Sequence, residues 1–420
     1  MSRFNWAGNY EYRAPTLAEP RTLQQVQDAV GSASSISPLG TRHSFNDIAD
    51  SANTQLSVAG LPARLDIDEA TRTVTVSAGE RYGEFVSQLH TAGWAIHNLA
   101  SLPHISVAGA IATGTHGSGD RNGALATAVA GLEFVAADGS LQHASRGDAH
   151  FEGMVVSLGA LGVVTAVELE IEPTFDVRQD LFENLPLSEL QDNFDAITSS
   201  AYSVSIFTDW GQLGATSVWL KSRMNTDTSA ADGTTFFGAT KAEHTLHMLA
   251  DGPTANVTQQ GGIPGPWWNR LAHFKLEFTP SNGDEMQTEY LLDRSHAPDA
   301  IDAIRRLQPQ IAPYLLISEL RTMSADQLWM SPAYGYDTLG IHFTWKNAQA
   351  VYGLLPAIDA ALAPFAARPH WGKVFDTDTD RLASLYPRIG DFRALAARLD
   401  PCGKFRNAYL DRTVFARALR

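Results

Sequence analysis

The chain has 420 residues and a formal net charge of −15, with 46 acidic and 31 basic residues. A chain this acidic is not expected to bind nucleic acid broadly or to dock on an anionic membrane, so we expect a small-molecule partner. The single cysteine, Cys402, excludes intrachain disulfides and cysteine-based metal clusters. Because the sequence shows neither an apolar run of about 18 residues nor a signal-peptide pattern at its start, we predict a cytoplasmic protein.

The first 173 residues alternate short helical and strand patterns, which favours a mixed α and β structure. A final alternating run over 162–173 predicts a strand that ends at a proline. The other expected elements are helices over 23–30 and 82–89, a strand over 36–39, and hairpins that pair 65–67 with 73–76 and 134–136 with 140–143.

The composition changes after this region, because residues 175–375 hold seven of the nine tryptophans. Strand-like segments recur there, which predicts an antiparallel sheet with helices on one face. We expect an irregular excursion over 223–262 and a basic, helical tail from about 376. The overall prediction is an α+β protein of two domains, one of residues 1–174 completed by 376–420 and one of residues 175–375. The expected strands of the second domain cover 202–207, 217–220, 273–278, 317–321 and 340–345.

A neutral, glycine-rich segment is the most informative feature of the chain. Residues 85–119 contain no charged side chain, and the segment ends in Gly114-Thr-His-Gly-Ser-Gly119. Such a segment lets the backbone approach a diphosphate or a planar cofactor closely. A tightly packed core turn explains the same composition equally well.

A second segment, Pro38-Leu-Gly-Thr-Arg-His-Ser-Phe-Asn46, runs from a predicted strand into a turn of small residues and then presents His43. This histidine could contact or bond a cofactor ring. Taken alone, however, a single histidine in a loop usually has no functional role. The common nucleotide-binding, P-loop, zincin and hydrolase motifs are absent. His244 and His247, with Glu243 beside them, could be zinc ligands on a helix, but a third ligand is not evident, so we predict no metal site.

Taken together, these two segments resemble the flavin-binding half of the vanillyl-alcohol-oxidase superfamily, and within it the bacterial alditol (xylitol) oxidases. The match extends over nearly the whole chain. It includes Ser101-Leu-Pro-His-Ile-Ser-Val-Ala-Gly109, Glu319-Leu-Arg-Thr322, His342-Phe-Thr-Trp345 and Arg368-Pro-His-Trp-Gly-Lys373. The resemblance implies an FAD-binding domain and an antiparallel-sheet substrate domain, called the cap.

The resemblance also implies FAD bound covalently through His43. A second, cysteinyl linkage is not expected, because no cysteine lies near the 101–119 loop. Arg42 departs from the small residue that many relatives have before the histidine, and it could meet a phosphate. The further residues expected to contact the cofactor are Gly40, Thr41, Arg42, Ser44, Ser101, Ser106, Gly109, Thr113, Gly114, Thr115, His116, Gly117, Ser118, Val163 and Asn407.

For the substrate, the resemblance assigns the reacting end to Arg321 and Lys373. A pair of cations can hold an alcohol oxygen while it gains alkoxide character. Ser101, Glu319, His342 and Thr344 match positions that hydrogen-bond the remaining hydroxyls. Because residues two apart on a strand face the same side, Glu319 and Arg321 would share a face, as would His342 and Thr344. Without the resemblance, a solvated strand face or a structural ion pair would explain these residues.

The expected reaction is oxidation of the terminal primary alcohol of an alditol to the aldose, with O₂ reduced to H₂O₂. The alternative is a sugar-1,4-lactone oxidase or dehydrogenase of the same superfamily. A non-catalytic carbohydrate- or flavin-binding protein is a third possibility, and it is disfavoured because a binding protein has no need for a covalently attached cofactor. Monomer or oligomer is left open.

Overall fold

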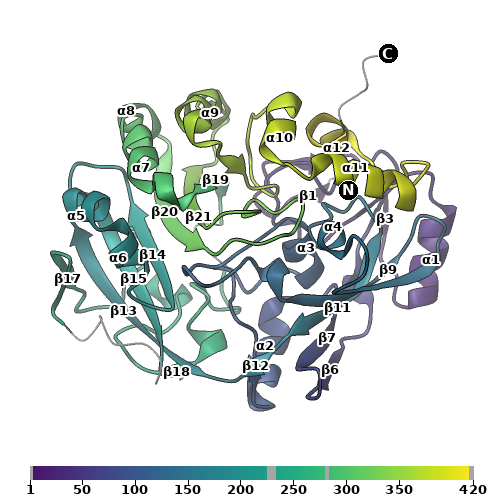
Figure 1. The fold of residues 1–420 in the computed structure, drawn as a ribbon, viewed down its shortest axis with the longest axis horizontal. Helices are drawn as coiled ribbons and strands as arrows, with labels where there is room; N and C mark the ends of the chain where they lie inside the picture. Colours follow the sequence, from purple (N-terminus) through teal and green to yellow (C-terminus); the bar gives the residue numbers. More distant parts are fainter. Residues whose placement is uncertain (1–2, 225–232, 280–282, 416–420) are drawn as a thin grey trace.

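The structure is a computed structural model that describes residues 3–224, 233–279 and 283–415. Its first half alternates short strands and helices, as Figure 1 shows in purple and blue. These elements are β1 (Arg3–Phe4), β2 (Glu11–Tyr12), β3 (Thr16–Ala18), α1 (Leu23–Ser32), β4 (Ile36–Pro38), β5 (Thr54–Leu56), β6 (Leu65–Asp68), β7 (Thr73–Ser77), α2 (Tyr82–Thr91), β8 (Trp94–Ala95), α3 (Val107–Ala112), β9 (Val129–Val135), β10 (Leu141–Ser145), α4 (Phe151–Val155), β11 (Val163–Glu170) and β12 (Glu172–Pro173).

The second half contains most of the longer strands. Its elements are β13 (Asp176–Leu185), α5 (Leu187–Asp192), α6 (Phe194–Thr198), β14 (Ser203–Thr208), β15 (Ala215–Arg223), β16 (Thr235–Phe236), β17 (Ala239–Lys241), β18 (Gly265–Pro266), β19 (Glu285–Asp293), α7 (Ala297–Arg305), α8 (Gln308–Ile311), β20 (Leu315–Met323), β21 (Thr338–Lys346), α9 (Leu355–Leu362), β22 (Arg368–Pro369), α10 (Thr379–Leu385), α11 (Ile389–Leu399) and α12 (Ala408–Thr413). Short 3₁₀ helices supplement them at η1 (Val58–Gly60), η2 (Leu125–Ala128), η4 (Thr254–Asn256), η5 (Trp267–Asn269), η6 (Arg294–His296), η7 (Gln349–Gly353) and η8 (Ala363–Phe365).

The helices predicted over 23–30 and 82–89 are confirmed as α1 and α2. The Thr22 side chain caps α1 by accepting a hydrogen bond from the Gln25 N–H. Apolar residues at helical spacing then bury one face of each helix, such as Val26 and Val30 on α1. Both predicted hairpins are also confirmed, as the antiparallel pairs β6–β7 and β9–β10. With β11 these strands form a five-stranded sheet in the order β10-β9-β11-β7-β6.

An antiparallel sheet dominates the second half, as predicted. Among the described residues it has ten strands, with the path β16-β17-β13-β15-β14-β20-β21-β19-β22 and β18 paired to β13. Helices α5 to α9 lie along this sheet in Figure 1. The region over 223–262 is less irregular than expected, because β16 and β17 extend the sheet there, while residues 225–232 lie outside the described residues.

The strand predicted over 273–278 is wrong. These residues form turns, with a single isolated bridge between Phe274 and Val257. The physical reason is that the N–H groups of His273 and Phe274 both donate to the carbonyl of Ser101, at 3.0 and 3.2 Å. This segment is therefore attached to a loop of the first half rather than paired along the sheet.

The C-terminal helices return to the first half of the molecule, where Figure 1 shows them in yellow near α1 and β3. Their apolar residues, including Leu382, Phe392 and Leu410, share one buried cluster with Val26 and Phe85 of the N-terminal region. A second cluster lies between the ten-stranded sheet and its helices. Among the described residues, no helix combines the length and the apolar character needed to cross a membrane.

Candidate active site

A cavity of about 1360 Å³ lies between the glycine-rich loops of the first half and one face of the ten-stranded sheet. This volume exceeds the ~1,000 Å³ upper range of ordinary drug-sized pockets, so a large cofactor and a small substrate can share it. Most of the predicted site residues line the cavity together. They are Gly40, Thr41, Arg42, His43, Ser44, Ser101, Ser106, Gly109, Thr113, Thr115, His116, Val163, Glu319, Arg321, His342, Thr344, Lys373 and Asn407.

Three predicted cofactor residues do not line the cavity, and packing explains each case. A Cβ on Gly114 would lie 2.9 Å from Pro332, and one on Gly117 would lie 2.4 Å from the Leu99 carbonyl, so both glycines serve close packing. The Ser118 hydroxyl is buried and donates to the carbonyl of Val204 on β14. These residues join the glycine-rich loop to its neighbours rather than facing the cavity.

His43 lies in the turn after β4 with its ring stacked on Trp6, at a centroid distance of 5.2 Å and an interplanar angle of 22°. Its Nδ1 is 3.0 Å from the Thr41 hydroxyl, whereas its buried Nε2 has no hydrogen-bond partner among the described residues. Burial, together with the neighbouring His104 and Lys373 side chains, lowers the pKa of His43 to about 3. The imidazole is therefore neutral at physiological pH and keeps a nucleophilic nitrogen.

The backbone around His43 approaches helix α3 closely. A Cβ on Gly40 would lie 2.6 Å from the Ser106 hydroxyl, and one on Gly109 would lie 2.8 Å from the same oxygen. The Ser106 N–H donates to the Thr41 hydroxyl at 3.3 Å, which ties the two segments together. This wall of small residues beside an unpartnered imidazole nitrogen fits a flat cofactor such as FAD.

Arg42 and Asn407 line the cavity from the loop around His43 and from the start of α12. Arg42 adopts a φ of 65°, a left-handed conformation that is uncommon outside glycine, and its side chain is exposed. The Asn407 side chain caps α12 by accepting from the Leu410 N–H, while its amide donates to the carbonyls of Ile48 and Asp50. Asn407 thus holds the C-terminal helix against the loop that follows His43.

The sheet face opposite His43 carries the predicted substrate residues. Glu319 and Arg321 lie on β20 and His342 and Thr344 lie on β21, and each pair shares the cavity face, as the two-residue spacing predicted. Glu319 is directly opposite His342 in the strand register. The Arg321 guanidinium donates to the Ser101 hydroxyl at 3.3 Å, and His342 Nε2 is 3.2 Å from the Thr344 hydroxyl.

Glu289 on β19 is a buried residue of this face to which the sequence analysis gave no role. Its Oε1 accepts from Arg321 Nη2 at 2.8 Å and lies 3.2 Å from His116 Nε2, while its Oε2 lies 3.4 Å from His342 Nδ1. Arg321 holds the pKa of Glu289 well below its usual range although burial alone would raise it. The side chain therefore remains a carboxylate among basic groups.

Gly340 on β21 lies opposite Arg321 on one side and opposite Leu291 on the other. A Cβ at this position would make ordinary van der Waals contact with Glu289 Oε1, at 3.5 Å. The Arg321 guanidinium therefore crosses the middle strand beside this glycine to reach the carboxylate on β19.

Lys373 approaches the same face from the loop after β22. Its ammonium donates to the Gln287 side-chain carbonyl on β19 and lies 4.9 Å from the centroid of the Phe45 ring. Burial lowers the pKa of Lys373 to about 8, and the negative charge of Glu289 opposes this effect. Lys373 is thus a cation that can lose its proton near physiological pH.

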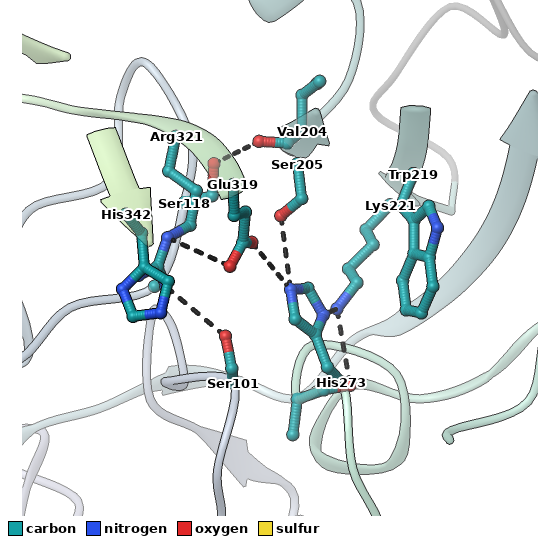
Figure 2. Close-up of polar contacts among 12 residues, drawn as sticks. Ser101, Ser118, Val204, Ser205, Trp219, Lys221, His273, Glu319, Arg321 and His342 are labelled. Carbon is teal, nitrogen blue, oxygen red and sulfur yellow. Dashed lines mark hydrogen bonds and ion pairs between the residues drawn. The ribbon is translucent and has the colours of Figure 1, made fainter. Parts of the chain in front are cut away.

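His273 is a second residue that the sequence analysis did not identify. Its ring lines the cavity and lies 2.9 Å from Glu319 Oε1, and its other nitrogen is in contact with Lys221 on β15. Figure 2 shows the resulting series of polar contacts from Ser101 through Arg321, Glu319 and His273 to Lys221. Within the described residues, no group of three potential ligands could hold a metal ion.

Comparison with known proteins agrees with this geometry. The family described as "FAD binding domain" matches residues 14–145, and the family described as "D-arabinono-1,4-lactone oxidase" matches residues 281–413. The chain is 48% identical over 410 residues to an alditol oxidase of a Streptomyces species, with 97% of each chain covered. It is 27% identical to an L-gulono-1,4-lactone dehydrogenase of Mycobacterium tuberculosis, with 98% of each chain covered.

Solved structures share the fold at low sequence identity. A cholesterol oxidase from Brevibacterium sterolicum superposes with a TM-score of 0.81 at 14% identity, covering 98% of this chain and 96% of the other. A xylooligosaccharide oxidase from Myceliophthora thermophila gives a TM-score of 0.74 at 14% identity, covering 98% and 93%. With its FAD-binding domain, its full-length relative and this shared fold, the chain belongs to the alditol oxidase family of FAD-dependent oxidoreductases, within the vanillyl-alcohol-oxidase superfamily.

Proposed function

We propose that this protein oxidises the terminal primary alcohol of an alditol to an aldehyde and transfers the electrons to O₂, which yields the aldose and H₂O₂. The main support is that two cations and several neutral or acidic hydrogen-bonding side chains line one cavity with His43. A polyol offers a hydroxyl on every carbon, so it can use such a densely polar face. FAD, when bound, would supply the acceptor for the hydride of the alcohol carbon, which carries both electrons.

Within this proposal, Arg321 and Lys373 hold the oxygen of the reacting hydroxyl. Both present N–H donors into the cavity, and a donor aimed at an oxygen that gains negative charge lowers the barrier to oxidation. Ser101, Glu319, His342 and Thr344 bind the remaining hydroxyls. Glu319, Ser101 and Thr344 supply oxygen atoms that can accept a hydrogen bond from a polyol hydroxyl.

We further propose that FAD is bonded covalently to His43, as the unpartnered nitrogen and the neutral imidazole allow. The glycine-lined wall formed by Gly40, Ser106 and Gly109 would lie against the cofactor. We also propose that residues 1–174 and 376–420 make up the FAD-binding domain and residues 175–375 the cap, since the C-terminal helices share the N-terminal core.

The test is an absorption spectrum of the purified protein before and after anaerobic addition of xylitol. Bleaching of the flavin bands, their return in air and the release of H₂O₂ would support the proposal. A flavin that stays oxidised with xylitol, sorbitol, mannitol and glycerol would contradict it.

The second candidate is a sugar-1,4-lactone oxidase or dehydrogenase. The match of residues 281–413 to the D-arabinono-1,4-lactone oxidase family favours it. Aldonolactones and polyols should therefore be compared in the same anaerobic assay. Faster flavin reduction by an aldonolactone would decide for this candidate.

A further inference from the structure

We propose that His273, with its proton placed by Lys221, is a positioning residue that orients the Glu319 carboxylate toward the polyol. This inference rests on the proposed function, because Glu319 is taken to bind a substrate hydroxyl. It adds two residues, His273 and Lys221, for which neither the sequence motifs nor the family resemblance gave a role.

The His273 side chain is enclosed on its apolar sides by two aromatic residues. Its ring centroid lies 5.1 Å from that of Trp219 and 5.7 Å from that of Phe207. Only 4% of the residue is exposed, although its ring reaches the cavity wall. In Figure 2 the ring lies between Lys221 on one side and Glu319 on the other. The ring is therefore fixed in place, and its two nitrogens determine its chemistry.

Lys221 determines which of these nitrogens carries the proton. An ammonium group has three N–H donors and no acceptor. The buried Lys221 Nζ has three partners at hydrogen-bond distance: the Leu271 carbonyl at 2.5 Å, the Ala272 carbonyl at 3.3 Å and His273 Nδ1 at 2.9 Å. Burial lowers the pKa of Lys221 to about 7, so the ammonium form prevails below neutral pH. In that form the third N–H of the lysine is directed at Nδ1, which acts as an acceptor.

The neutral ring then carries its proton on Nε2, which faces Glu319. Burial and the charge of Lys221 lower the pKa of His273 to about 4, so the ring is neutral at physiological pH. Nε2–H donates to Glu319 Oε1 at 2.9 Å, and the Ser205 hydroxyl lies 3.4 Å from the same nitrogen. If Nδ1 carried the proton, Nε2 and the carboxylate would be two acceptors facing each other.

Glu319 is consequently held from two sides. His273 occupies Oε1, and Arg321 Nε lies 3.6 Å from Oε2. The backbone N–H of His273 also donates to the carbonyl of Ser101, so one residue anchors two proposed substrate contacts. A carboxylate fixed in this way can accept from a substrate hydroxyl without first being ordered, which favours binding of the polyol rather than the oxidation step.

The first experiment compares His273→Phe, which keeps an aromatic ring without nitrogens, with His273→Gln, whose amide N–H can replace Nε2–H. Loss of a hydrogen bond to a charged group corresponds to an affinity change of about tenfold or more. For His273→Phe we expect the KM for xylitol to rise about tenfold, with kcat within about threefold of the native value. The KM for ethylene glycol should rise less, because this short diol has no hydroxyl remote from the reacting end that could bind Glu319. His273→Gln should recover most of the xylitol KM.

Equal losses for xylitol and ethylene glycol, a fall confined to kcat, or no recovery with Gln would overturn the proposal. Flavin content and near-UV circular dichroism identify a variant that has not folded. If the native protein oxidises aldonolactones and no polyol, the proposed function fails, and the same variants are compared with a long and a short lactone.

The second experiment needs no substrate and therefore separates the two proposals. Long-range ¹H–¹⁵N correlation spectra of the ¹⁵N-histidine-labelled holoenzyme report which ring nitrogen carries the proton, and His273→Gln identifies the His273 signals by their loss. At pH 6, which lies between the pKa of about 4 for His273 and the pKa of about 7 for Lys221, we expect the Nε2–H form in the native protein and a shift toward Nδ1–H in Lys221→Met. Lys275→Met is the matched control, because this lysine lies in the same segment as His273 and donates to the Ala255 carbonyl rather than to a histidine nitrogen. A native His273 protonated on Nδ1 would overturn the proposal.

Discussion

Replacing Glu289 by Gln tests the charge arrangement of the active site most directly. The substitution keeps a carbonyl that can accept from Arg321 but removes the negative charge that lies among Arg321, His116 and His342. Breaking a buried ion pair by removing one partner costs about 3–5 kcal/mol. Because Gln retains the hydrogen bond, we expect a loss near the lower end, about 3 kcal/mol. Denaturant unfolding of the holoenzyme measures this loss.

The same substitution should also change the pH dependence of the reaction. Among the charges that raise the pKa of Lys373 against its burial, Glu289 has the largest effect. Without this charge the pKa of Lys373 falls from about 8, by about one pH unit if the lost interaction is worth ~1.4 kcal/mol. Lys373 then loses its proton at a lower pH, so the alkaline limb of the kcat/KM profile for a polyol should move in the acidic direction.

Glu170→Gln provides the control, because it removes a carboxylate from an exposed ion pair with Arg146 outside the cavity lining. We expect that variant to keep the native pH profile. An alkaline limb that is the same in Glu289→Gln and in the native enzyme would refute the reasoning that Glu289 maintains the charge of Lys373. A stability loss under about 1 kcal/mol would refute the buried ion-pair argument.

Four further predictions concern neighbouring residues. His43→Ala should yield protein whose flavin is released on acid precipitation; retention of acid-stable flavin would contradict the linkage to His43. Lys373→Met should slow anaerobic flavin reduction by a polyol by about 10²–10³-fold, as removal of an oxyanion-type donor does, and an unchanged rate in stopped-flow measurements would exclude Lys373 from the reaction. Gln287→Glu should raise the pKa of Lys373 by adding a negative charge beside its ammonium, so the alkaline limb should move to higher pH, opposite to Glu289→Gln. The pKa of His273 is lowered from 6.5 to about 4. Between these two pH values the unfolded chain therefore binds a proton that the native protein does not. The free energy of unfolding should therefore fall by about 1.4 kcal/mol per pH unit as the pH drops through it. His273→Gln should remove this part of the acid sensitivity, whereas His244→Gln, at an exposed histidine, should not.

Local patterns in the sequence predicted those parts of the site that lie on one strand. The strands predicted over 317–321 and 340–345 fall inside β20 and β21, and alternation alone places Glu319 beside Arg321 and His342 beside Thr344. The assignment of His43 depended on the family resemblance, because local patterns do not distinguish this histidine from the other loop histidines.

Contacts between strands could not be predicted in the same way. Glu289 reaches Arg321 across β21, and Lys221 reaches Glu319 only through a histidine of a distant loop. Strand order and register determine such contacts, and a single sequence specifies neither. One signal was present for β19, where Glu285, Gln287 and Glu289 recur at every second position of the strand. No comparable pattern surrounds His273, whose segment was predicted to be a strand.

The sheet face balances its charges while leaving one cation available to the substrate. Arg321, which lines the cavity, has the carboxylates of Glu289 at 2.8 Å and Glu319 at 3.6 Å, whereas Lys221 lies behind His273 and outside the cavity lining. Lys373 differs, because its direct side-chain hydrogen bond is to the neutral amide of Gln287 and not to a carboxylate. A neutral acceptor orients the ammonium without cancelling its charge, whereas a carboxylate in direct contact would compete with an oxygen that becomes negative during oxidation. The proposed role of Lys373 therefore depends as much on the absence of charge at Gln287 as on the charge of Glu289.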